Sequence, residues 1–264
     1  EMSNISGSIY KVLGGGNGFY DIYDVTRLYP SIYARKLLNK LDGISPDQYS
    51  ISGAPYGDGT YIIKYGSYYN QDTEHDLDWG PQNMFFKPDP ETNESKDGNF
   101  KQNQYDSSGN YIGSASLTTG TSGDWISIQM PDSILIDSYI FIMPYYSSTY
   151  ATRGPMKYKL YGCDTGDNQW ELIYTETLTT SSYTNTYVNA NDSYKKVLSS
   201  TDRITDRKLF NTFAFSFETN GGFGHIALGE IELYGKELLV SQSIASATSG
   251  GGLVLTDPLE YHSP

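Results

Sequence analysis

The stretch WISIQMPDSILIDSYIFIM, residues 125–143, alternates apolar and polar side chains on both sides of a Pro-Asp-Ser break. Successive side chains of a β-strand point to opposite faces of the sheet. The alternation therefore predicts two strands of one sheet, joined by a turn at residues 131–133. The apolar positions expected to face a shared core are Ile126, Ile128, Met130, Ile134, Ile136, Ile140 and Ile142.

Further short alternating segments follow, separated by clusters of Gly, Asn, Asp and Ser. They are residues 156–162, 168–176, 213–219 and 227–235. The first two flank the turn CDTGDN and predict a hairpin. In the last segment we expect Ile231 and Leu233 to point inward, and Glu230 and Glu232 to point outward. Many short strands with turn signals between them predict an all-β fold, a β-sandwich.

One short helix is expected near the N-terminus, in the stretch SIYARKLLNKLDG. Ser31 can cap its start and Gly43 can end it. Its apolar residues at helical spacing are Ala34, Leu37, Leu38 and Leu41. The changes of pattern divide the chain into an N-terminal segment at 1–46, a β-sandwich at 47–236 and a strand-like C-terminal extension at 237–264.

Composition and charge restrict the expected partners. The chain has 264 residues, of which 38% are hydrophobic, so it can bury a core without metals or disulfides. Its formal charge of -13 repels phosphate backbones, and no basic patch offsets it, so we expect no nucleic acid partner. No apolar run reaches the roughly 18 residues that cross a bilayer, so no membrane insertion is expected. Because the chain opens EMSNISGS, we expect any export leader to have been removed.

Three stretches together resemble a known family. GDWISIQMPDSILIDSYIFI, RGPMKYKLYGCDTGDNQWELI and FAFSFETNGGFGHIALGEIELYG follow one another in the order of the discoidin or coagulation-factor type C family of galactose-binding-like domains. GSYYNQDTEHDLDWGPQNMFF is similar to an early segment of that family. The Arg-Gly-Pro that opens the second stretch looks like the copies found in structural proteins of phages and large DNA viruses. The resemblance covers residues 47–236.

The resemblance implies a discoidin-like, jelly-roll β-sandwich that is not catalytic and whose loops at one end bind glycans, lipid or proteins. Animal members often carry a clamping disulfide, which the single Cys163 cannot form, and this favours a virus-like or microbial relative. Many members hold structural calcium with an Asp, loop oxygens and a Glu of the closing strand. Phe86 stands at the position of that Asp, so Glu230 is the one weak metal candidate and no cofactor is expected.

The loop MPYYSSTYATRGP is the strongest candidate for a binding site. Its tyrosines offer flat faces to sugar C–H groups, while its arginine can donate to hydroxyls or a carboxylate. In the alternative interpretation, the tyrosines pack on a neighbouring loop and the arginine pairs internally with an acidic side chain. The loop TNGGFGH adds two secondary candidates. The candidate glycan-binding residues are Tyr145, Tyr146, Tyr150, Arg153, Phe223 and His225.

Sequence signals for catalysis are weak. The histidines His75, His225 and His262 lie in unrelated contexts without metal-ligand spacing, and no nucleophile elbow is present. GGGNG at residues 14–18 opens no helical pattern, and the acidic loop at 89–99 lacks the glycine and glutamate of a helical-hand calcium site. We therefore expect a protein that is not an enzyme.

The C-terminal extension carries two apolar runs around a Gly-Gly-Gly hinge. Such segments can add to the sheet edge of a neighbouring subunit, or they can fold back on their own domain. The assembly candidates are Leu238, Leu239, Val240, Leu253, Val254 and Leu255.

The sequence thus favours a structural and adhesive surface protein, extracellular or on a virion, phage tail or fibre, whose partners are glycans and its own subunits. The alternatives are a purely structural self-assembling protomer and, third, a carbohydrate-binding module of a larger enzyme.

Overall fold

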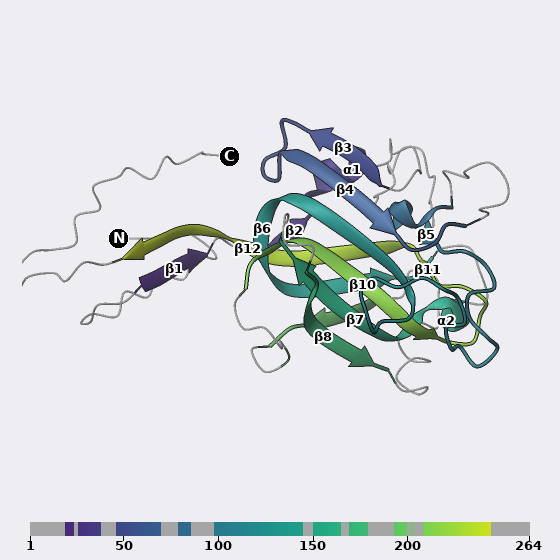
Figure 1. Cartoon of the computed structure of the whole chain (residues 1–264). Coiled ribbons are helices and arrows are strands. Elements are labelled where there is room, and N and C mark those ends of the chain that lie inside the picture. Colours follow the sequence, from purple (N-terminus) through teal and green to yellow (C-terminus); the bar gives the residue numbers. More distant parts are fainter. Residues whose placement is uncertain are drawn as a thin grey trace, which may run out of the picture.

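In the computed structural model, antiparallel strands form two layers with short helices at their margins (Figure 1). The structure describes residues 19–23, 26–37, 46–69, 79–85, 98–144, 150–164, 169–178, 193–199, 202 and 208–243. The helices are α1 (Ile32–Leu37), the 3-10 helix η2 (Pro81–Phe85) and α2 (Tyr150–Arg153). The strands are β1 (Phe19–Tyr23), β2 (Arg27–Tyr29), β3 (Asp47–Ile51), β4 (Gly59–Tyr65), β5 (Gly98–Asn99), β6 (Asp124–Ile142), β7 (Pro155–Cys163), β8 (Glu171–Thr177), β9 (Ser193–Val197), β10 (Phe210–Asn220), β11 (Ala227–Leu228) and β12 (Glu230–Ser243).

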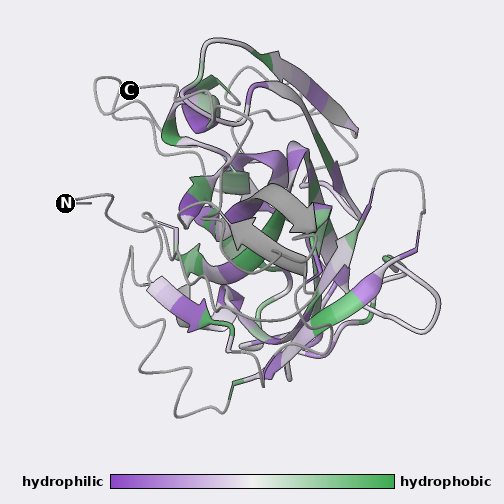
Figure 2. Ribbon diagram, turned by 90° about the vertical axis from the view of Figure 1, so that its left-hand side faces the viewer, coloured by the Kyte–Doolittle hydropathy of each residue, from purple (hydrophilic) through white to green (hydrophobic). Residues whose placement is uncertain are grey.

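Strand β6 belongs to both layers. Its first half pairs with β10 on one side and β4 on the other, which gives a layer in the order β8, β7, β10, β6, β4, β3. Its second half pairs with β12 and β9, and β1 and β2 pair with β12 in turn. Figure 2 shows hydrophilic and hydrophobic stretches alternating along the strands. The predicted β-sandwich is therefore confirmed, and its core lies between the two layers.

Residues 124–142 form one continuous strand, so the turn expected at residues 131–133 is wrong. At this point β6 leaves one layer and enters the other. The register also shifts, because Tyr234 pairs with Ser138 while Gly235 pairs with Ile136. The extra residue is a β-bulge, which reverses the faces that the following side chains occupy.

The bulge in β6 changes which aromatic and aliphatic residues enter the core. Tyr139 and Phe141 are fully buried, whereas Ile140 and Ile142 are half-buried, so the inward orientation expected for these two isoleucines is wrong. The earlier apolar positions of β6, from Ile126 to Ile136, are buried as predicted. The alternation of apolar and polar residues thus predicted the strands correctly, but it did not predict the bulge that exchanges the inward and outward faces.

The remaining strand predictions are largely confirmed. Strands β7 and β8 pair as an antiparallel hairpin, although its turn at 165–168 lies outside the described residues. Ile231 and Leu233 are fully buried. Glu230 and Glu232 alternate with them and so point to the other face of the sheet. Glu232 is nevertheless only 7% exposed, so this face is not open to solvent there.

Helix α1 starts where the sequence predicts. The Ser31 hydroxyl accepts a hydrogen bond from the Ala34 amide at 3.2 Å, which caps the first turn. The predicted continuation through residues 38–43 lies outside the described part of the chain. No helix among the described residues is long and apolar enough to span a bilayer. Strand β2, just before α1, pairs with β12. The division of the chain at residues 46 and 236 stays a prediction.

Candidate functional site at one end of the sandwich

Several loops gather at one end of the sandwich, because β4 and β10 end there while β6 and β7 begin there. Phe217 of β10 pairs with Asp124, and Asn220 pairs with Pro155. We call the loop end residues 66–69, 100–123, 150–154 and 220–226. Figure 1 shows α2, β5 and β11 together at this end.

The loop after β10 is shaped by the side chain of Asn220, which is 2% exposed. Its amide nitrogen donates to the carbonyl oxygens of Phe223 at 2.7 Å and His225 at 3.2 Å. Its amide oxygen accepts from the Gly222 amide at 2.9 Å. Gly222 has a φ of +98°, a conformation that suits glycine because it lacks a Cβ. The loop is thus held in one shape from within.

This loop and the segment after β4 together form a row of rings that we call the aromatic row: Phe223, His225 and Tyr69. The Phe223 and His225 ring centroids are 5.0 Å apart, and those of His225 and Tyr69 are 5.7 Å apart. The Arg153 guanidinium lies 4.3 Å from the Phe223 ring centroid, which is a cation–π contact. At the other end of the row, Gln102 Nε2 donates to the Tyr69 hydroxyl at 2.8 Å.

The aromatic row is partly accessible. Phe223, Tyr69 and Arg153 are half-buried, and Gln102 is exposed, whereas His225 is 4% exposed. The Phe223 amide donates to the Thr152 carbonyl at 3.2 Å and so fixes the row against α2. The arrangement offers ring faces flanked by a cationic donor and an amide, which are the groups that bind sugar rings and hydroxyls.

The imidazole of His225 packs between two rings. Burial lowers its pKa to about 4, and the nearby charge of Arg153 acts in the same direction. Within the described residues, Nε2 of His225 is buried and has no hydrogen-bond partner. At neutral pH the side chain is therefore a neutral ring that supports Phe223 and Tyr69.

Of the residues predicted from sequence, the structure brings Arg153, Phe223 and His225 together. Tyr145 and Tyr146 lie outside the described residues, and of Tyr150 only its place in α2 is described. Three further contributors, Tyr69, Gln102 and Asn220, are not among the residues predicted from the sequence. The Asn-Gly-Gly turn is a signal that points to Asn220.

Glu230, the weak metal candidate, is engaged by a cation of the protein itself. The Arg35 guanidinium donates to Glu230 Oε2 at 3.0 Å and to the Ile231 carbonyl at 2.8 Å. No group of three or more potential metal-ligating His, Cys, Asp or Glu side chains occurs in the part of the chain that the structure describes. Glu230 Oε2 is thus paired with Arg35, and a metal-binding role of Glu230 stays a prediction.

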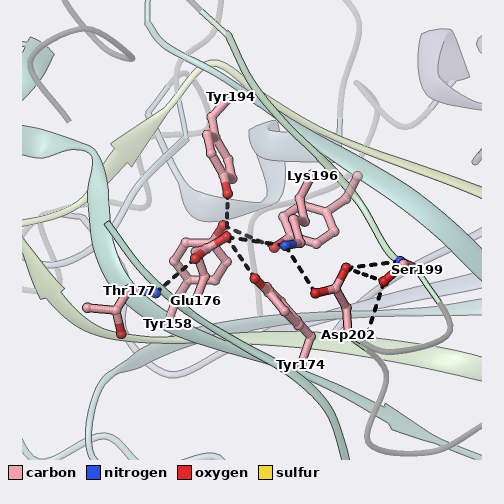
Figure 3. A network of polar contacts seen from close by, with 9 residues as sticks. Tyr158, Tyr174, Glu176, Thr177, Tyr194, Lys196, Ser199 and Asp202 are labelled. Carbon is pink, nitrogen blue, oxygen red and sulfur yellow. Dashed lines mark hydrogen bonds and ion pairs between the residues drawn. The ribbon is translucent and has the colours of Figure 1, made fainter. Parts of the chain in front are cut away.

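A second polar cluster lies between the edge strands β8 and β9 (Figure 3). The hydroxyls of Tyr174 and Tyr194 both donate to Glu176 Oε2. The Lys196 ammonium lies 4.3 Å from the Tyr174 ring centroid and 3.6 Å from Asp202 Oδ1. The cluster joins one edge of each layer, and its charged groups are paired with one another. We assign it to closure of the sandwich.

The likeness to known proteins is structural. No family model matches the sequence, and no curated protein matches it either. The module CpGH89CBM32-5 of Clostridium perfringens, in complex with GalNAc-β-1,3-galactose, is 10% identical with a TM-score of 0.42, over 66% of this chain and 94% of that one. An F5/8 type C domain of Bacteroides fragilis is 12% identical with a TM-score of 0.41, over 67% and 93% of the two chains. A fragment of a putative chitobiase from Bacteroides thetaiotaomicron is 10% identical with a TM-score of 0.44, over 72% and 98%.

Proposed function

We propose that the protein is a non-catalytic, adhesive surface protein that binds glycans through the loop end. The observation that supports this most is the aromatic row with Arg153 against Phe223 at one end and Gln102 against Tyr69 at the other. Ring faces pack on the C–H groups of a sugar, and guanidinium and amide groups donate to its hydroxyls. The formal charge of -13 disfavours strongly anionic polymers as ligands.

The test is a glycan array followed by calorimetry on the sugar that binds best. We expect Phe223→Ala to weaken binding roughly tenfold or more, because it removes both a ring face and the support of Arg153. Tyr33→Ala is the matched control, since Tyr33 is 44% exposed on α1. Absence of any bound sugar, or equal affinity of Phe223→Ala and wild type, would contradict the proposal.

Self-association is a second proposed property, supported by the pairing of β1 and β2 with β12. Phe19 pairs with Ser243 and Tyr29 pairs with Leu233, and the register of β1 shifts between Ile22 and Tyr23. β6 pairs with β12 only as far as Glu237. Beyond that point β1 and β12 form a two-stranded ribbon that projects from the body (Figure 1). Such a ribbon is marginally stable by itself.

The β12 side of the ribbon suits pairing between copies, whereas β1 carries one charged residue, Asp21, opposite Ser241. Residues 238–256 contain no charged side chain, in a chain of formal charge -13, so two copies meet here without strong repulsion. We propose that β12 pairs with β12 of a second copy around a twofold axis, along the edge that β6 has left. Leu238, Leu239 and Val240 lie in this stretch, whereas Leu253, Val254 and Leu255 lie outside the described residues.

Gln242→Lys, opposite the uncharged Tyr20 of β1, places like charges near that axis and is expected to shift the protein to monomers in light-scattering chromatography. Ser193→Lys, on the exposed edge strand β9, is the matched control and is expected to leave the mass unchanged. A wild type that is monomeric at all concentrations, as when its own tail covers the edge, would contradict the proposal.

Glycan binding with self-association fits a virion, phage tail or extracellular fibre, where repeated weak sites gain avidity. The two alternatives separate in the same experiments. A purely structural protomer associates but binds no sugar, and a module of a larger enzyme binds sugar without associating.

A further inference from the structure

A buried carboxyl group lies beneath the loop end. Asp124, the first residue of β6, is fully buried, and its Oδ1 accepts a hydrogen bond from the Ser67 hydroxyl at 2.6 Å. Its other oxygen, Oδ2, is buried without a hydrogen-bond partner among the residues the structure describes. A half-satisfied buried carboxyl is costly, so a role beyond filling space is expected of it.

Ser67 connects this carboxyl group to a second loop. Its hydroxyl oxygen also accepts from the Lys101 amide at 3.1 Å. Tyr69 follows two residues after Ser67 and Gln102 follows directly after Lys101, and these two side chains are hydrogen-bonded to each other. Asp124 and Ser67 thus fasten together the two segments that carry one end of the aromatic row.

The segment at residues 100–104, which contains Lys101 and Gln102, is hydrogen-bonded to the loop that carries His225. The Phe100 amide donates to the Ile226 carbonyl at 3.2 Å, and the Gln104 amide donates to the Gly224 carbonyl at 2.8 Å. A shift at Lys101 therefore moves Gln102 and Tyr69 relative to His225, whose ring contacts Tyr69.

We propose that Asp124 is a positioning residue of the glycan site: through Ser67 it holds Tyr69 and Gln102 against His225, and it does so best when its carboxyl group is protonated. This inference rests on the proposed function and adds a regulation by pH to it.

The groups around Asp124 explain the direction of the pH effect. Burial raises its pKa from 3.8 to about 7, and the Ser67 hydrogen bond opposes only part of this shift. Tyr105 and Tyr111 of the neighbouring loop face it, but burial raises their pKa as well, so they stay neutral. Since the folded site holds the proton more tightly than an opened one, the closed arrangement is fully favoured below pH 4 and loses stability as pH rises toward 7.

The experiment measures the affinity for the best array sugar from pH 5.5 to pH 8.5, together with amide hydrogen exchange at residues 66–69 and 100–105. We expect wild-type affinity to fall about tenfold between pH 6 and pH 8, equivalent to about one pKa unit of coupling. Asp124→Asn, which mimics the protonated group, is expected to keep its affinity across this range. Asp124→Ala and Ser67→Ala are expected to bind weakly and exchange faster at every pH.

Asp132→Asn is the control, because Asp132 lies in the same strand but outside the loop end, and it is expected to keep the wild-type pH profile. An Asp124→Asn variant with the wild-type pH slope, or an Asp124→Ala variant with wild-type affinity and exchange, would overturn the inference. If no sugar binds, the proposed function fails alone, because the exchange of wild type and Asp124→Asn against pH still decides the positioning role.

Discussion

At the scale of single residues, Arg35 is fully buried although it carries a charge. Burial lowers its pKa, and the Glu230 carboxylate opposes that shift. Hydrogen bonds to Glu230 and to the Ile231 carbonyl fix α1 against the outer side of β12. An ion pair of this kind is costly to break, because Glu230, whose side chain is 15% exposed, stays largely shielded from water without its counter-charge.

Arg35→Met is therefore expected to lower the free energy of unfolding by about 3 kcal/mol in urea titrations. Lys36→Met, at the exposed neighbouring position of α1, is the control, with an expected change within about 0.5 kcal/mol. Adding Glu230→Met to Arg35→Met removes the unpaired carboxylate, so part of the lost stability is expected to return. Equal free energies of unfolding for Arg35→Met and Lys36→Met would show that the ion pair does not hold the helix.

At the scale of elements, alternation in the sequence predicts strands well because each strand buries one face. It does not predict how β6 is shared between layers, since this depends on pairing with β12 and β10, which are about a hundred residues away in the chain. The Pro-Asp-Ser break looks like a turn, yet the paired strands on either side keep the backbone extended through it. The bulge beside Ile136 is likewise set by its partner strand.

The candidate site shows the same division. Arg153, Phe223 and His225 were predictable because they lie in polar loops next to clear strands. Tyr69 and Gln102 were not, since their contact depends on hydrogen bonds between Ser67, Lys101 and Asp124 that no local pattern encodes.

At the scale of the whole molecule, β12 relates the two proposed surfaces. It begins at Glu230, next to the loop that ends in β11, and it ends at Ser243 in the projecting ribbon. Figure 1 shows the ribbon on the side away from α2, β5 and β11. Copies joined through their ribbons would present their loop ends outward, so that association leaves the glycan sites accessible and adds avidity.

The central claim is that the loop end contacts the glycan. The most direct measurement is a titration of the isotope-labelled protein with its best array sugar, followed by amide chemical shifts. We expect changes confined to residues 66–69, 100–105, 150–154 and 220–226. Changes centred instead on the Glu176 cluster or on the ribbon, or no change at saturating sugar, would contradict the account.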